Sequence, residues 1–143
     1  MTIVQFHNNL RELDLRGIAY DLVISDEETI VNYQKDQMMS GKDATGKDIA
    51  PSYKYKSYAE LKRSMNNRPQ FWTPDLKYSG EFHSGFYLDH DTLTVTSSDA
   101  KTPSLIKKYG EWIFGFNKET MRKYAEGFKD MFFEKITDTL SMV

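Results

Sequence analysis

The residues that most suggest a bound phosphate lie between Gly41 and Asp48, which read GKDATGKD. Their glycine and lysine spacing matches a phosphate-binding P-loop up to the last position. A P-loop needs Ser or Thr there to hold Mg²⁺, and the carboxylate of Asp48 would repel a phosphate instead. An EF-hand calcium loop is excluded as well, because Gly41 stands where its first Asp is required. We therefore expect neither nucleotide nor calcium binding in this loop.

Two histidines and two aspartates lie close together further along the chain: His83, Asp89, His90 and Asp91. These residue types bind zinc and other divalent metals. However, residues 89–91 fall on the tip of a predicted hairpin, where polar side chains are favoured in any case. His83 is about a full strand away from that tip. We expect solvated turn residues here, with no metal and no other cofactor.

The sequence offers no arrangement typical of nucleophilic or acid–base catalysis. It has no cysteine, which excludes thiol catalysis, disulfides and zinc ribbons. Ser79-Gly80 and Ser84-Gly85 lack the Gly-x-Ser-x-Gly form of a nucleophile elbow. Several acidic residues could supply a glycosidase pair, but no spacing singles out two of them: Asp75, Glu81, Glu111 and Glu119. We expect that the protein is not an enzyme.

A basic aromatic segment between residues 53 and 68 could bind a macromolecule. Lysines neutralise phosphates and tyrosines stack on unpaired bases, so nucleic-acid binding is one interpretation. Against it stands a net charge of −2. Aromatic residues are also enriched at protein interfaces, which favours protein contacts. The residues that we expect to make these contacts are Tyr53, Lys54, Tyr55, Lys56, Tyr58, Lys62 and Arg63.

Length and composition are typical of one globular domain spanning residues 1–143. A chain of this length buries enough surface to fold without disulfides. Aromatic residues reach 14%, which suits both a core and an interface. The N-terminus shows no basic region followed by an apolar run, so we expect no signal peptide. No apolar stretch approaches the ~20 residues of a membrane helix, and we expect no membrane partner.

Charge alternates in sign along the chain. Residues 1–40 have a net charge of −4, residues 41–70 of +4, residues 71–100 of −4 and residues 101–143 of +2. One interpretation is a solvated loop that happens to be basic. The other is a set of oppositely charged faces on which copies or partners dock, because complementary charge sets register and partner choice.

The apolar pattern predicts an α+β fold: a small antiparallel β-sheet with N-terminal and C-terminal amphipathic helices packed on it. In the second predicted strand, Leu93 and Val95 should share one side. The predicted helices are 4–14, 18–39 with a break at Ser25, 58–66, and a long one after Asn117; the predicted strands are 82–88, 92–97 and 112–116.

Cap residues place the ends of these helices. Ser25 opens a Ser-x-x-Glu capping box, Gly41 suits a C-terminal cap, and Asn117 suits an N-cap. Phe133 lies off the apolar face of the last helix, so we expect it to be exposed. That face comprises Met121, Tyr124, Ala125, Phe128, Phe132, Ile136 and Leu140.

Four groups of residues carry a resemblance to a known family and span roughly residues 25–140. They are Gln37-Met38-Met39-x-Gly41-x-Asp43-x-x-Gly46 with Ile49 and Pro51-x-Tyr53; Pro74-Asp75-Leu76-x-x-Ser79-Gly80-x-Phe82; Ser97-Ser98-Asp99-x-Lys101; and Lys108-Tyr109-Gly110 with Ile113-Phe114-Gly115-Phe116. In order and spacing these motifs resemble bacteriophage virion-morphogenesis, or tail-completion, proteins. The versions in phages and prophages of gut Bacteroidetes are the most similar.

The resemblance implies a non-enzymatic structural or assembly protein of the virion. It would act at the head–tail junction or the tail end, in a ring of identical subunits, after synthesis in the bacterial host cytoplasm. Its partners would be other neck or tail proteins and copies of itself. The chain has Phe116 where many relatives have Leu, and it lacks the Arg-Pro-Phe ending of the broader group. Both the neck and the tail therefore remain open as positions.

Overall fold

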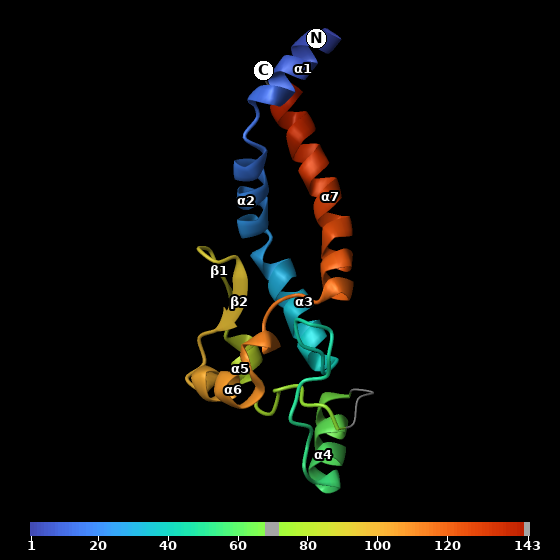
Figure 1. The fold of residues 1–143 in the computed structure, drawn as a ribbon, viewed down its shortest axis with the longest axis vertical. Helices are drawn as coiled ribbons and strands as arrows, with labels where there is room; N and C mark the ends of the chain where they lie inside the picture. Colours follow the sequence, from blue (N-terminus) through green and yellow to red (C-terminus); the bar gives the residue numbers. More distant parts are fainter. Residues whose placement is uncertain (68–71, 142–143) are drawn as a thin grey trace.

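The computed structural model, which describes residues 1–67 and 72–141, has an α+β fold. Arg68 and Phe71 lie outside the described residues. Figure 1 shows a long molecule with both termini at one end and α4 at the other. The elements in chain order are α1 (Ile3–Glu12), α2 (Leu15–Ser25), α3 (Glu27–Met39), α4 (Lys56–Asn66), α5 (Glu81–Ser84), β1 (Phe86–Asp89), β2 (Thr94–Ser97), α6 (Thr102–Tyr109), the 3₁₀ turn η1 (Glu111–Ile113) and α7 (Lys118–Ser141).

The predicted antiparallel sheet is confirmed as a hairpin of β1 and β2. Its register pairs Leu88 with Val95 and Tyr87 with Thr96. Leu88 and Val95 are buried, and both strands pack against α3. Tyr87 is on the opposite side and is 42% exposed. The hairpin therefore has one covered face and one open face.

The core lies at the middle of the molecule, where α3, the hairpin, α5 and η1 meet. Met38 and Ile113 at its centre are fully buried. Phe82 and Phe86 pack edge to face with ring centroids 5.1 Å apart. The other buried members of this cluster are Ile30, Val31, Ile49, Leu88, Val95 and Tyr124.

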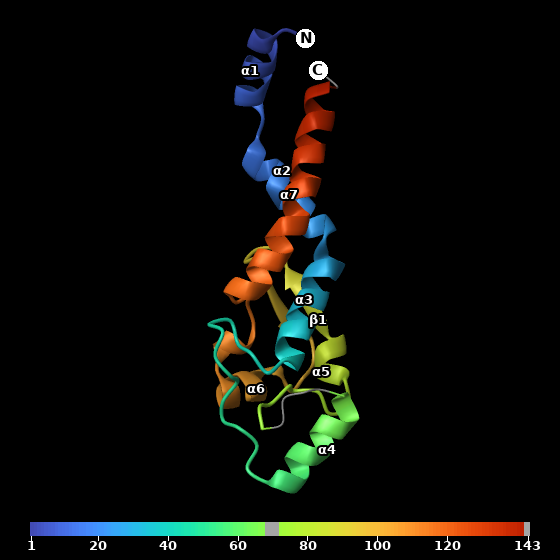
Figure 2. The same ribbon diagram turned by 90° about the vertical axis from the view of Figure 1, so that its right-hand side faces the viewer.

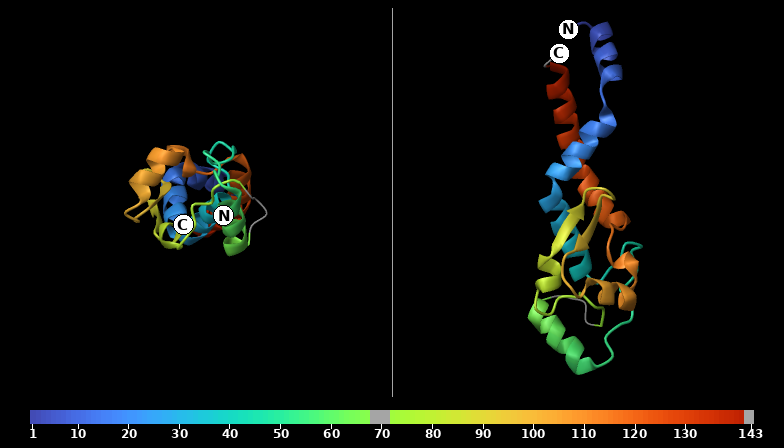
Figure 3. Two further views of the ribbon diagram at one scale, coloured as in Figure 1. Left: turned by 90° about the horizontal axis from the view of Figure 1, so that it is seen from below. Right: turned by 90° about the vertical axis from the view of Figure 1, so that its left-hand side faces the viewer.

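A stalk extends from this core toward the termini. Helices α1 and α2 form one arm, and the C-terminal half of α7 forms the other (Figures 1 and 2). Helix α7 packs along α2 and α3, but α1 buries none of its residues. The end-on and side views of Figure 3 show a narrow molecule with both termini at the same end. Among the described residues, no helix combines the length and hydropathy needed to cross a membrane.

Several predicted helix ends are confirmed. The predicted break in the long N-terminal helix falls at Asp26, between α2 and α3. Gly41 has φ +77° just after α3, where its N–H donates to Met38 O and that of Lys42 donates to Gln37 O. This is a Schellman C-terminal cap. Asn117 caps α7, because its Oδ1 accepts the N–H of Thr120 at 2.9 Å.

The predicted capping box at Ser25 is wrong. Its hydroxyl donates backward to Leu22 O, and Asp26 occupies the N-cap position without a side-chain bond. The predicted strand at 92–97 also begins later than expected. Leu93 lies in the turn with φ +54° and is 40% exposed, so it does not share the buried side of Val95.

The prediction of a strand over 82–88 is wrong at its first half, because residues 81–84 form the short helix α5. Gly80, with φ +89°, reverses the chain before it. The N–H of Ser84 then donates to Gly80 O. Phe82 on α5 and Phe86 on β1 are both buried and are four residues apart. A spacing of four fits one face of a helix and one face of a strand equally well. Periodicity over so few residues is ambiguous.

The third predicted strand, 112–116, is also wrong. Instead of pairing with a strand, its backbone is held by two buried glutamines of α3. Gly115 N donates to Gln34 Oε1 at 2.9 Å, and Gln37 Nε2 donates to Gly115 O at 2.7 Å. The amide groups of the glutamines thus satisfy backbone groups that a neighbouring strand would otherwise pair.

Helix α6 lies in a segment for which neither a helix nor a strand was predicted. Pro103 stands in its first turn and Gly110, with φ +93°, follows its last residue. These are the usual start and stop residues of a helix. Leu105, Ile106 and Tyr109 pack against the core from this helix.

Candidate functional site

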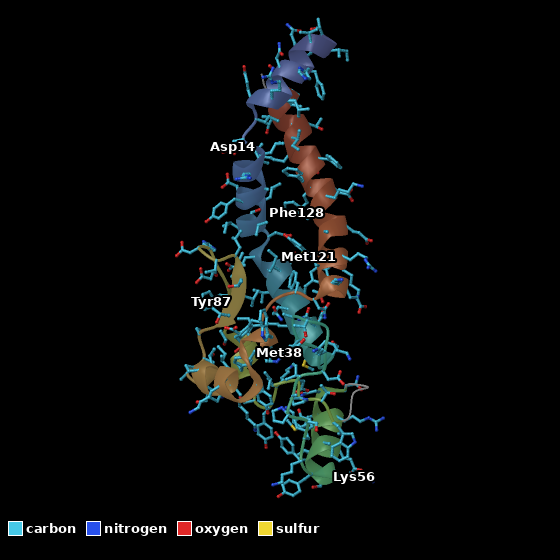
Figure 4. The ribbon with its side chains drawn as sticks, in the orientation of Figure 1. Asp14, Met38, Lys56, Tyr87, Met121 and Phe128 are labelled. Carbon is cyan, nitrogen blue, oxygen red and sulfur yellow. The ribbon has the colours of Figure 1, made fainter. Side chains whose placement is uncertain are left out.

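Helix α4 carries most of the residues that the sequence predicts to make contacts. It stands at the end opposite the stalk, and Lys56 in its first turn lies at the lowest point of Figure 4. Its two buried residues, Ala59 and Lys62, are three positions apart and therefore share one side. That side attaches the helix to the body of the molecule. Asn67, with φ +46°, ends it.

A buried ion pair joins α4 to the segment that precedes α5. Lys62 Nζ lies 2.9 Å from Asp75 Oδ1, and the two side chains are 3% and 0% exposed. Lys62 also donates to Lys77 O, and Asn66 Nδ2 donates to Asp75 Oδ2 at 2.5 Å. Burial alone would raise the pKa of Asp75. However, hydrogen bonds from the backbone N–H of Lys77 and from the side chains of Lys62 and Asn66 outweigh burial and lower the pKa of Asp75.

His83 lies next to this network, on α5. Its Nε2 is 2.8 Å from Asp75 O, and its ring stacks on Phe86 with centroids 5.0 Å apart. Burial lowers its pKa from 6.5 to about 4, against the opposing effect of Asp75. The ring is therefore neutral at pH 7, and Nε2–H donates to the carbonyl. These contacts give His83 a structural role in the support of the surface above it.

Above the buried pair, two adjoining hollows form a surface that we call the tyrosine groove. One hollow has a volume of about 280 Å³ and the other about 650 Å³. They share Tyr53, Tyr58 and Tyr109 on their walls. Tyr53 and Tyr58 meet edge to face at 5.1 Å. Five of the nine tyrosines in the chain line the groove: Tyr53, Tyr55, Tyr58, Tyr78 and Tyr109.

Lysines stand over the rings at the rim of the groove. Lys54 Nζ lies 5.8 Å from the ring of Tyr55, and Lys108 Nζ lies 5.1 Å from the ring of Tyr109. Neither ammonium pairs with a carboxylate within residues 1–67 and 72–141. Burial, then Tyr109 and Tyr78, raises the pKa of Tyr58, so its hydroxyl stays neutral. The groove thus combines aromatic walls with unbalanced positive charge.

The predicted contact residues do not all reach this surface. Tyr53, Lys54, Tyr55 and Tyr58 line the groove. Lys56 and Arg63 are exposed on α4 outside the lining. Lys62 lines the smaller hollow, but it is 2% exposed and bound to Asp75, so it supports the groove from its floor.

Several lining residues come from parts of the sequence that were not predicted as contacts, among them Tyr78, Lys108 and Tyr109. The last two lie on α6, for which no helix was predicted. The spacing of Leu105 and Tyr109, i and i+4, could have indicated a helix that turns one side to the core.

The backbone amides of the loop at 41–48 are largely used within the protein itself. Its amides are occupied by Asp43, whose Oδ1 accepts from Thr45 N at 2.9 Å and Lys47 N at 3.1 Å. Lys42 pairs with Asp48. The loop also donates Ala44 N to Trp112 O at 2.7 Å. It therefore acts as a brace between α3 and the segment before α7.

The histidines and aspartates that suggested a metal site separate in the fold. His83 is buried near Asp75, whereas His90 is exposed at the hairpin turn and lies 3.1 Å from Glu27 Oε1. The Oδ1 of Asp89 accepts the N–H of Asp91 and of Thr92. No group of three or more potential metal ligands occurs in the part of the chain that the structure describes.

We compared the chain with protein-family models, curated proteins and solved structures, and none of the three comparisons gave a match.

Proposed function

We propose that this protein is a non-enzymatic phage structural or assembly protein of the head–tail junction or tail end. It acts through contacts with other virion proteins and with copies of itself, arranged as a ring of identical subunits. It is made in the bacterial host cytoplasm and becomes part of the virion. The motif resemblance supplies the phage context of this proposal, and the surface of the molecule supports contact as its mode of action.

The observation that carries the proposal is the exposure of apolar side chains at both ends of a long molecule. The tyrosine groove is at one end. At the other, the stalk exposes Ile3 at 83% and Val4 at 68%. Exposed apolar patches of this kind mark interaction sites. Further exposed apolar residues of the first stalk arm include Phe6, Leu10, Leu15 and Tyr20.

The motifs that carry the resemblance have structural roles in this fold. Gly41 caps α3, Asp43 closes the loop that braces Trp112, and Asp75 holds α4 in place. Gly115 binds the glutamines of α3. Three of the four motif groups thus fix one segment to another, as a protein that works through its shape requires.

Deletion of the gene from its phage or prophage tests the proposal. Electron microscopy of the lysate is expected to show unjoined heads and tails, or tails with unfinished ends. The wild-type gene supplied from a plasmid should restore complete particles. Complete, infectious particles from the deletion strain would refute a role in assembly.

Single-stranded nucleic acid is the second candidate ligand, because Lys54 and Lys108, which pair with no carboxylate among the described residues, lie beside tyrosine rings in the groove. Titration of a fluorescent oligonucleotide at two salt concentrations tests it. Phosphate contacts make affinity fall steeply with salt. Measurable binding with that dependence would favour a nucleic-acid accessory protein. The proposed assembly role expects no binding at physiological salt.

A further inference from the structure

We infer that the open face of the hairpin in one copy docks into the tyrosine groove of the next copy. This inference rests on the proposed function, in which neighbouring copies contact one another. Both surfaces belong to this chain. The inference therefore names the partner of the groove as a second copy and specifies which of its elements enters.

The open hairpin face is aromatic and acidic. Tyr87 and Asp89 are two residues apart on β1 and so point to the same side, opposite the core. Across the sheet they pair with Thr96 and Thr94. At the turn, the side chain of Asp91 is exposed. Figure 4 shows Tyr87 on the outer side of the hairpin, away from the helices.

The charge on this face is negative and stable. The backbone N–H groups of Thr92 and Asp91 lower the pKa of Asp89, so its carboxylate stays ionised. Glu27 lies beside the turn, 3.1 Å from His90 Nε2. The hydroxyl of Tyr20 donates to His90 O, which fixes the turn against α2. The hairpin is therefore held in place as a defined acidic projection.

The groove complements this projection in size and charge. Both hollows are open to solvent, and the volume of each exceeds the about 150 Å³ of a cavity that accepts a benzene molecule. The groove therefore has enough volume for an aromatic side chain such as Tyr87. Lys54 and Lys108 lack carboxylate partners among the described residues, and Asp89 and Asp91 would supply them. Opposite charges at an interface fix orientation and partner choice.

A single copy cannot join its own two surfaces. The groove lies beside α4 at one end of the molecule, and the hairpin lies near its middle, beside α2 and α3 (Figure 1). The contact is consequently heterologous: each copy uses its groove toward one neighbour and its hairpin toward another. Such contacts build rings when the rotation between copies closes, and filaments when it does not.

Sedimentation of two variants tests the contact. One carries Lys54→Gln and Lys108→Gln in the groove; the other carries Tyr87→Ser and Asp91→Asn on the hairpin. All four positions lie at the surface or in the groove lining, so circular dichroism should show native folding. Wild-type protein is expected to associate with a dissociation constant below about 1 mM, and each variant at least about tenfold more weakly. Lys47→Gln with Lys118→Gln, which removes the same charge elsewhere, should leave association unchanged.

Mixing the two variants gives the decisive result. The groove variant keeps a native hairpin and the hairpin variant keeps a native groove, so one native contact remains per pair. The mixture should form 1:1 dimers that grow no further, detectable by native mass spectrometry. A monomeric wild type, or no dimer in the mixture, would overturn the copy-to-copy contact. The deletion experiment is independent of this result, so the assembly role could survive while this particular contact failed.

Discussion

Buried ionisable groups are concentrated beneath the tyrosine groove, where Lys62, Asp75 and His83 share one polar network. Their burial makes the groove sensitive to changes that never touch its surface. An ion pair at 3% and 0% exposure leaves either partner without water when the other is removed. Predictions at the residue scale therefore concern the stability of this support.

The first prediction concerns the two halves of the ion pair. Lys62→Met should lower the free energy of unfolding by about 3–5 kcal/mol, because Asp75 becomes a buried charge without its partner. Adding Asp75→Asn should recover part of that loss. Urea unfolding of the two single variants and the double variant measures the coupling. Additive effects would show that the pair does not act as a unit.

The second prediction concerns pH and follows from the lowered pKa of His83. The unfolded chain takes up a proton near pH 6.5, whereas the folded protein does so only near pH 4. Stability is therefore complete above pH 6.5 and declines as the pH falls toward about 4, by at most about 1.4 kcal/mol per unit. Asp75, with its pKa below the ordinary 3.8, adds a further loss only at lower pH.

Unfolding of wild type and of His83→Gln across pH 7 to 4 checks this prediction. Glutamine keeps a hydrogen-bond donor but does not titrate in this range. The variant should be less stable than wild type at pH 7 and should lose less stability on acidification. Parallel curves for the two proteins would mean that His83 is not the group responsible.

At the residue scale, the sequence predicted the residues of the groove surface better than the buried residues that hold them in place. Five of the seven proposed contact residues line the groove, and one of these, Lys62, is buried. The burial of Lys62 could not be predicted, because a lysine within a basic segment is usually solvated and its partner Asp75 is 13 positions away in an irregular segment. Long-range pairing of this kind leaves no local pattern.

At the element scale, the helices divide into those that form the core and those that only extend from it. Helix α3 has five buried residues, whereas the ten-residue α1 has none. Isolated helices of that length are marginal in water. A contact with a neighbouring molecule along the stalk would supply the burial that α1 lacks within one copy.

The third prediction compares two isoleucines in these two helices. Ile30→Ala should cost about 2–5 kcal/mol, because Ile30 is 6% exposed in the core. Ile3→Ala should change the free energy of unfolding by less than about 0.5 kcal/mol, because Ile3 is 83% exposed. Chemical denaturation of dilute protein measures both. A large cost for Ile3→Ala would show that α1 is part of the cooperative core.

Sequence patterns predicted the long helices and the hairpin of β1 and β2, but they failed on the short helical segments. The helices over 3–39, α4 and α7 agree with apolar periodicity and with cap residues such as Asn117. Elements of three or four residues, α5 and η1, were taken for strands because so short a run has no distinguishable period. The segment 112–116 was misassigned because side-chain amides of α3 satisfy its backbone.

At the scale of the whole molecule, the alternating charge of the sequence becomes spatial separation. The basic segment is at the α4 end, and the acidic hairpin is near the middle (Figure 1). A net charge of −2 conceals this division. Two complementary surfaces on one chain are suited to repeated assembly. The overall composition does not indicate such a pair of surfaces.

The fourth prediction tests that division directly. Reversing two charges, with Lys54→Glu and Lys56→Glu, should leave the monomer folded but weaken assembly with copies or partners. Lys47→Glu with Lys118→Glu makes the same change in net charge away from the groove and serves as the control. Circular dichroism reports the fold and sedimentation reports assembly. Equal assembly of the two double variants would show that the basic segment is not a contact surface.

The most direct measurement of the central proposal is the quantity of this protein in purified phage particles. Quantitative mass spectrometry of gradient-purified virions should find a small, fixed number of copies per particle, as a ring at the neck or tail end requires. Particles that contain none of the protein, from cells in which it is abundant, would contradict its assignment as a component of the virion.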